Sequence, residues 1–191
     1  MTQLRSLLSL AFLGTALAAQ QPEPATLGVQ ARASFPQSGL SDAVGGGTAP
    51  GLGASLVAEM DLAQWFEGWR ARLDLGMDVW FWGNLTQLPG KSGRVSAGHV
   101  SGELVRFLRP GGTPITLGPY LTLGAGMYAW SGTRVDSTLG KVDMSSAHPA
   151  GILGCGWRMN KSLDLEVKVL MGKIDPQTTA LAAMAAATWR F

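Results

Sequence analysis

The carboxyl-terminal stretch, Ala180 to Phe191, constrains the fold more than any other segment of the chain. It reads ALAAMAAATWRF, and residues two apart in an extended strand share one face. One face is wholly apolar and consists of Leu181, Ala183, Ala185, Ala187, Trp189 and Phe191. The opposite face consists of Ala182, Met184, Ala186, Thr188 and Arg190. This pattern predicts a β-strand that runs to the end of the chain with one side against an apolar medium.

The amino-terminal segment has the features of a secretory signal peptide. Arg5 supplies the positive region, residues 7–17 the apolar core, and Ala16-Leu17-Ala18 the small-residue cleavage motif. The apolar run is too short to cross a membrane as a helix, which needs about 20 apolar residues. We therefore expect residues 1–19 to be removed, residues 20–25 to form a short periplasmic leader, and residues 26–191 to form one domain.

The composition favours a membrane barrel over a soluble domain. Charged residues make up 15% of the chain, against about 25% in soluble domains, and 26 of the 191 residues are glycine. Loss of Arg5 changes the 15 Lys and Arg to 14, against 13 Asp and Glu. This near-balance gives no surplus charge for nucleic acid, so we expect no nucleic-acid partner. The single cysteine, Cys155, excludes an internal disulfide.

Seven further segments alternate apolar and polar residues, which is the period of a half-buried strand. In the clearest segment, Leu73, Leu75 and Met77 alternate with Arg72 and Asp74. The predicted strands are residues 26–35, 51–62, 69–82, 95–108, 115–130, 148–159, 163–171 and 180–191. Their connections alternate long and short, and the long ones are residues 36–50, 83–94, 131–147 and 172–179. The pattern predicts an all-β protein, an eight-stranded antiparallel up-and-down transmembrane β-barrel.

Alternation alone does not separate the two kinds of barrel, because a soluble barrel points its apolar face inward and a membrane barrel points it at lipid. Tryptophan near the strand ends and alternating connection lengths are typical of outer-membrane barrels. We expect an aromatic girdle of Trp65, Trp69, Trp80, Trp82, Trp130, Trp157, Trp189 and Phe191. Strict alternation would direct Trp80, Trp82 and Trp130 inward, so at that rim either the strands bulge or these rings cap the lumen.

On these features the chain resembles the small OmpA/OmpX-type proteins, the outer membrane protein β-barrel domain family, whose closing strand ends on an aromatic residue as Phe191 does here. The resemblance implies a location in the outer membrane of the Gram-negative cell envelope, with both termini periplasmic. It also implies contact with outer-membrane lipid and lipopolysaccharide, recognition of the C-terminal strand by the barrel-assembly machinery, and a monomer. By propensity alone, residues 180–189 also suit an Ala-rich helix, but that helix would lack caps.

The polar face of the predicted strands carries many of the charged residues. Eight strands leave an interior just wide enough for side chains, and an isolated buried charge is costly. We therefore expect a lumen plugged by an ion-pair network. Its members are Arg32, Glu59, Asp61, Arg70, Arg72, Asp74, Asp78, Glu103, Arg158, Asp164, Glu166, Lys168 and Arg190. The alternative is a narrow porin-like channel for small solutes.

One short pattern suggests an enzyme as a third reading. His99, Ser101 and Glu103 share one side of a predicted strand, and the lipid A deacylases among outer-membrane barrels use a His-x-Ser pair with an acidic residue. A base and an orienting carboxylate could activate the serine. These residues lie on the face assigned to the lumen, beyond the reach of lipid, so we expect no catalytic residues and no enzyme.

The long connections complete the functional prediction. Their charged residues include both signs without a same-sign cluster: Lys91, Arg94, Arg134, Asp136, Lys141, Asp143, Lys173 and Asp175. Loops on a rigid scaffold often carry function, so we expect a structural or surface-interaction role. The sequence contains no metal-ligand cluster or nucleotide-binding motif, and we expect no metal and no cofactor.

Overall fold

The structure is a computed structural model that describes residues 25–44, 50–63, 65–82, 93–108, 117–136 and 140–191. The predicted signal peptide lies outside the described residues, as does all of the predicted leader except Ala25. Among the residues that are described, no helix is long and apolar enough to cross a membrane.

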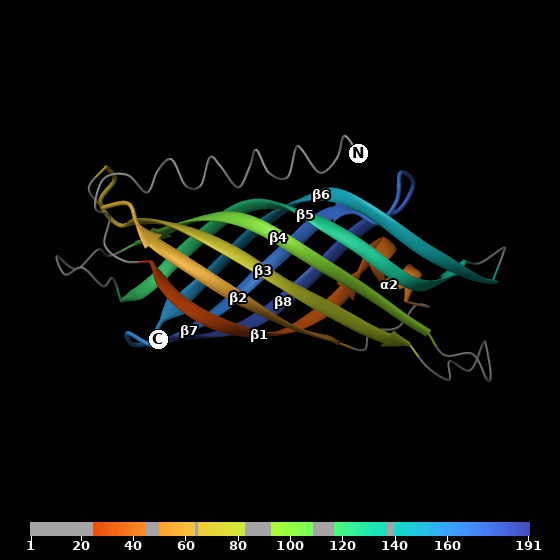
Figure 1. Ribbon diagram of the computed structural model, residues 1–191, viewed down its shortest axis with the longest axis horizontal. Helices are drawn as coiled ribbons and strands as arrows, with labels where there is room; N and C mark the ends of the chain where they lie inside the picture. Colours follow the sequence, from red (N-terminus) through yellow and green to blue (C-terminus); the bar gives the residue numbers. More distant parts are fainter. Residues whose placement is uncertain (1–24, 45–49, 64, 83–92, 109–116, 137–139) are drawn as a thin grey trace.

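Eight strands form a closed antiparallel barrel in which each strand pairs with its neighbours in sequence and β8 pairs with β1 (Figure 1). The strands are β1 (Thr26–Gln37), β2 (Gly51–Asp61), β3 (Trp69–Trp82), β4 (Gly93–Phe107), β5 (Gly118–Asp136), β6 (Gly140–Arg158), β7 (Leu163–Lys173) and β8 (Thr179–Arg190). The predicted fold is confirmed. The ring is closed by the carboxyl-terminal strand, whose pairing with β1 runs from Gly28 opposite Arg190 to Gln37 opposite Leu181.

The apolar side of each strand faces outward, and the charged side faces the lumen. In β3, Leu73, Leu75 and Met77 are 53–55% exposed, whereas Arg72 and Asp74 are 2% and 1% exposed. A soluble barrel of this size would show the reverse arrangement, because water would then surround it. The exposed apolar surface therefore requires lipid around the barrel.

The two ends of the barrel differ (Figure 1). We call one of them the turn end; β1 begins there, β8 finishes there, and the short connections 62–68 and 159–162 lie there. We call the other the loop end, and it carries helix α2 (Ser38–Ala43) between β1 and β2. This helix was not predicted from the sequence.

The predicted loop over residues 131–147 is wrong, because most of it is strand. β5 and β6 stay paired from the barrel wall out to Asp136 opposite Gly140. At the loop end this hairpin extends beyond the other strands (Figure 1). A hairpin beyond the membrane needs no apolar face, so its backbone pairing continues where the alternation of side chains no longer predicts it.

Candidate functional site

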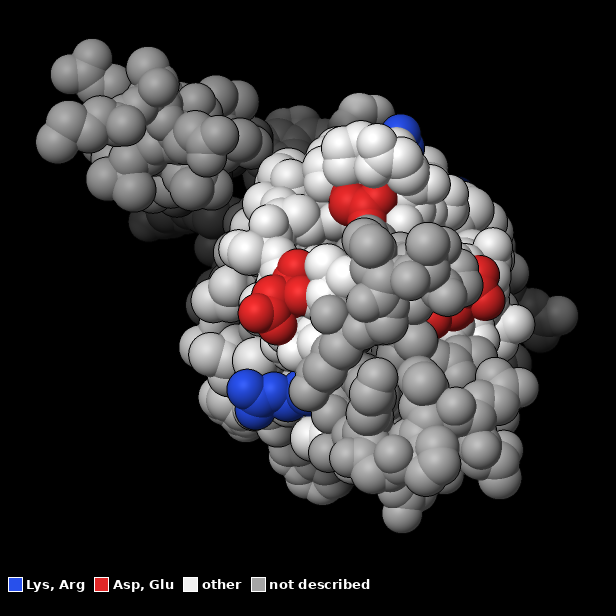
Figure 2. All heavy atoms as spheres, turned by 90° about the vertical axis from the view of Figure 1, so that its right-hand side faces the viewer, with Lys and Arg blue, Asp and Glu red and all other residues white. Residues whose placement is uncertain are grey.

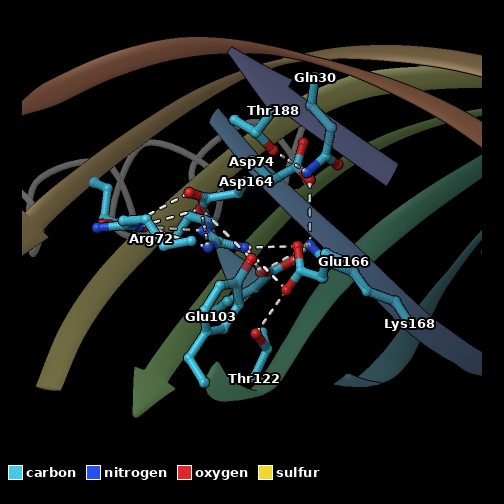
Figure 3. A network of polar contacts seen from close by, with 12 residues as sticks. Gln30, Arg72, Asp74, Glu103, Thr122, Asp164, Glu166, Lys168 and Thr188 are labelled. Carbon is cyan, nitrogen blue, oxygen red and sulfur yellow. Dashed lines mark hydrogen bonds and ion pairs between the residues drawn. The ribbon is translucent and has the colours of Figure 1, made fainter. Parts of the chain in front are cut away.

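The lumen contains a buried ion-pair network (Figure 3). Every strand except β5 contributes at least one charged side chain to it from its inward face. All of the charged residues predicted for the lumen are at most 5% exposed, with the exception of Asp61. Asp61 lies at the turn end, where its side chain is 17% exposed and binds Arg70 at 2.8 Å.

The centre of the turn-end half is Glu59, whose carboxylate contacts four guanidinium groups. Its oxygens lie 2.7 Å from Arg158 Nη2 and 3.0 Å from Arg190 Nη2. They lie 3.2 Å from Arg70 Nη1 and 3.3 Å from Arg72 Nη2. This one carboxylate therefore joins β2 to β3, β6 and β8 across the lumen.

A second carboxylate, Asp164 on β7, shares three of these cations, and Arg72 Nη2 is the most distant of them at 3.9 Å. It lies 2.9 Å from Arg158 Nε, and it also forms an ion pair with Arg190. Toward the turn end, the Arg158 guanidinium lies over the ring of Phe107, 4.8 Å from its centre, and Phe107 packs on Tyr120. The ionic cluster is thus covered by aromatic rings on this side.

Lys168 extends the network toward the middle of the barrel. Its Nζ lies 2.8 Å from Glu103, 3.3 Å from Glu166 and 4.0 Å from Asp74. Arg72 binds the first two carboxylates as well, at 3.2 Å and 2.9 Å (Figure 3). These contacts make one continuous network of the turn-end cluster and the mid-lumen groups.

The mid-lumen cluster contains Arg32, Asp74, Asp78 and His99. Arg32 binds Asp74 at 3.1 Å and Asp78 at 3.3 Å. The ring of His99 lies 3.2 Å from Asp74 through Nε2 and stacks on Tyr128, with ring centres 4.9 Å apart. His99 therefore joins the ionic network to the aromatic side chains above it.

The loop-end half of the lumen is filled by apolar side chains, which we call the apolar cap. Its members are Leu40, Ala43, Val44, Trp80, Val95, Ala97, Tyr128, Trp130, Met144, Ala150, Ile152, Leu170, Ile174, Ala180, Ala182 and Met184. Helix α2 is short, but it places Leu40 and Ala43 over the mouth, where they are 0% and 3% exposed. The side chains of the cap are at most 9% exposed, and those of the ionic network other than Asp61 at most 5%, so the described inward side chains are withdrawn from water.

The girdle assignment was wrong for Trp80 and Trp130. Both are buried, at 1% and 2% exposure, and their rings stack with centres 5.8 Å apart. The strict alternation was the better guide: of the two options at that rim, these rings cap the lumen. The side chain of Trp82 lies outside the described part of the chain.

The other predicted girdle residues lie at the turn end and face outward. Trp65, Trp157, Trp189 and Phe191 are 46–74% exposed, and Trp69 is half-buried beneath Arg106. Aromatic rings at this depth suit the boundary between hydrocarbon and water.

The three residues of the enzyme reading do not form a catalytic group in the structure. Ser101 is 1% exposed, and its hydroxyl has no hydrogen-bond partner. Glu103 is held by Lys168 and Arg72, and His99 binds Asp74. Within the described ranges, no group of three or more His, Cys, Asp or Glu side chains could hold a metal ion.

The outward apolar surface, the enclosed charges and the closed ring of strands define a transmembrane β-barrel of the small, eight-stranded outer-membrane type. No protein-family model matches the chain, and no curated protein matches its sequence.

Solved structures do match the fold. Ail, the attachment invasion locus protein of Yersinia pestis, is similar with a TM-score of 0.58 and 11% identity. A second Ail structure, in complex with the heparin analogue sucrose octasulfate, is similar with a TM-score of 0.54 and 12% sequence identity. Neisserial surface protein A is similar with a TM-score of 0.53 and 11% sequence identity. Each match covers 87% of this chain and 97% of the other chain. At such identities the similarity shows a shared fold.

Proposed function

We propose that this protein is a small bacterial outer-membrane barrel with a structural or surface-interaction role, and that its lumen does not conduct solutes. The turn end then faces the periplasm, and the loop end faces the outside. Recognition of β8 by the barrel-assembly machinery and a monomeric state belong to the same proposal.

The filled lumen is the observation that carries this proposal. The ionic network holds six cations, namely Arg32, Arg70, Arg72, Arg158, Lys168 and Arg190. It holds seven carboxylates, namely Glu59, Asp61, Asp74, Asp78, Glu103, Asp164 and Glu166. A passing ion would have to break these pairs, since each of the groups is paired with at least one of opposite charge and is withdrawn from water.

The apolar cap is a second obstacle in series with the network. Trp80 and Trp130 are stacked across the loop-end half, and Leu40 of α2 is fully buried with them. A constriction lined by apolar side chains excludes water and ions by dewetting. A solute entering from the loop end would therefore meet a dry region before it reached any charge.

If the lumen is closed, partners would bind at the surface of the loop end. Figure 2 views this end and shows acidic side chains at separate places around the mouth, with fewer basic ones among the coloured residues. The described charges there include Asp42, Asp143 and Asp175 beside Arg94 and Lys173. One Ail structure holds a sulfated sugar; the mixed signs here favour a partner without such dense negative charge.

Reconstitution into planar lipid bilayers tests the proposal. We expect a silent bilayer after insertion of the full chain, verified by a heat-dependent shift of the same preparation on gels. A known porin inserted under the same conditions is the positive control. Steady single-channel conductance from this chain would refute the closed lumen and establish the narrow channel instead.

A further inference from the structure

Charged side chains are few on the lipid-facing side of the barrel. Among the described strand residues, those that face outward at the loop end are Arg94, Asp143 and Lys173. At the turn end, Arg106 on β4 is the outward-facing charge among the described strand residues. A cation at a lipid-facing position costs free energy that falls to about 0–1 kcal/mol near the interface, so its position and partners need a physical explanation.

The side chain of Arg106 is held in a defined place. It lies opposite Trp69 on β3 and Leu121 on β5. Its guanidinium lies over the Trp69 ring, 5.5 Å from the ring centre, and donates a hydrogen bond to the carbonyl of Glu67. The next residue of β4 is fixed to the same turn by a 2.9 Å bond from Phe107 N to Gly68 O. The cation is therefore oriented by the turn between β2 and β3.

The surroundings of Arg106 are apolar and exposed. Leu104 and Leu121, its neighbours on β4 and β5, are 45% and 49% exposed. The same turn carries Trp65 and Phe66, which are 46% and 63% exposed. Aromatic side chains of this kind settle at the level of the lipid headgroups. The guanidinium thus lies where hydrocarbon gives way to headgroups.

The chemistry of the guanidinium selects its partner. Arginine has five N–H donors in a planar fork, and the bond to Glu67 is the one described for Arg106. None of the ion pairs among the described residues includes Arg106. A phosphate diester fits the free donors in bidentate geometry and neutralises the charge.

We propose that Arg106, supported by Trp69, binds the phosphate of a phospholipid headgroup in the leaflet at the turn end. This inference rests on the membrane location in the proposed function, but not on the closed lumen. The headgroup completes the hydrogen bonds of the guanidinium, while Trp65, Phe66 and the neighbouring leucines contact its acyl chains. The site would fix the depth of the barrel at this edge.

Native mass spectrometry of the full chain in a neutral detergent tests the site. The probes are phosphatidylglycerol, phosphatidylethanolamine and a diacylglycerol with the same acyl chains. We expect one tightly held phospholipid on the wild type, at least tenfold weaker binding in Arg106→Gln, and partial recovery in Arg106→Lys. Arg94→Gln, which removes an outward cation at the loop end, is the matched control and should bind as the wild type does.

Three outcomes would overturn the proposal. If Arg106→Gln bound phospholipid as tightly as the wild type, the side chain of Arg106 would serve only to stabilise the turn between β2 and β3. Equal binding of the diacylglycerol would mean that the phosphate is not recognised, and displacement of the lipid by excess glycerol phosphate would assign the site to a small soluble phosphate. Each variant must also keep the heat-dependent shift on gels, because loss of this shift would show that the barrel has misfolded. A conducting wild type would refute the closed lumen while leaving this result standing.

Discussion

Glu59→Gln is the most informative single substitution in the lumen. The change keeps the size of the side chain and removes one charge from among four guanidinium groups at 2.7–3.3 Å. Loss of one partner from a buried ion pair costs about 3–5 kcal/mol. Asp164 still neutralises Arg158 and Arg190 after the substitution, but Arg70 loses a buried partner. We therefore expect the free energy of unfolding to fall by about 3–5 kcal/mol.

Equilibrium unfolding in urea, with the protein in phospholipid vesicles and followed by tryptophan fluorescence, measures this change. Asp61→Asn is the matched control, because Asp61 is 17% exposed and binds a guanidinium already held by Glu59. The Asp61–Arg70 pair is partly buried, with side chains 17% and 6% exposed, but Arg70 keeps Glu59 as a partner in this variant, so the control should lose less than Glu59→Gln. If Glu59→Gln lost as little as the control, the carboxylate would not be the centre of the turn-end cluster.

Two further predictions use the same unfolding assay. Leu123→Arg places a charge on the lipid side, where Leu123 is 63% exposed, and should cost about 2–4 kcal/mol in vesicles; a neutral result would contradict the lipid-facing assignment. Gly53→Ala should cost about 1–3 kcal/mol, because its new Cβ would collide with the carboxylate of Asp78. Gly98→Ala, whose Cβ would meet nothing within 4 Å, should be nearly neutral, and equal losses would refute the steric argument.

The sequence could predict which side chains face lipid and which face the lumen, because this depends on residue type and on the alternation of side chains along a strand. Arg72 and Asp74 had to lie opposite to Leu73 and Leu75 in any strand. The alternating connection lengths, the tryptophans near the strand ends and the low charge of the polar face indicated which side met lipid. Applied without exception, the same alternation also places Trp80 and Trp130 inside, where they are buried. The girdle assignment failed for these two residues because it relied on their position near the strand ends instead.

The particular ion pairs could not be predicted, since they depend on the closure of the ring and on the tilt of the strands. Arg72 contacts Glu59 on the neighbouring strand, but it also reaches Glu166 on β7, which is 94 residues away. Helix α2 was missed for a related reason. Its six residues show no periodic pattern of their own, and burial of Leu40 against the cap holds the turn in place.

The division of the lumen into a network and a cap limits where activity can lie. The cap consists of buried apolar side chains, and the charged groups of the network are paired with one another. Because the two lie in series, a single substitution in either half leaves the other obstacle intact. His99 and Ser101 lie at the level of the mid-lumen cluster and are 4% and 1% exposed, so a substrate would have to pass one of the two obstacles to reach them. If the proposed closed lumen holds, we expect recognition by this protein to occur at surfaces outside the ring, at the loop end and along the lipid-facing edge near Arg106.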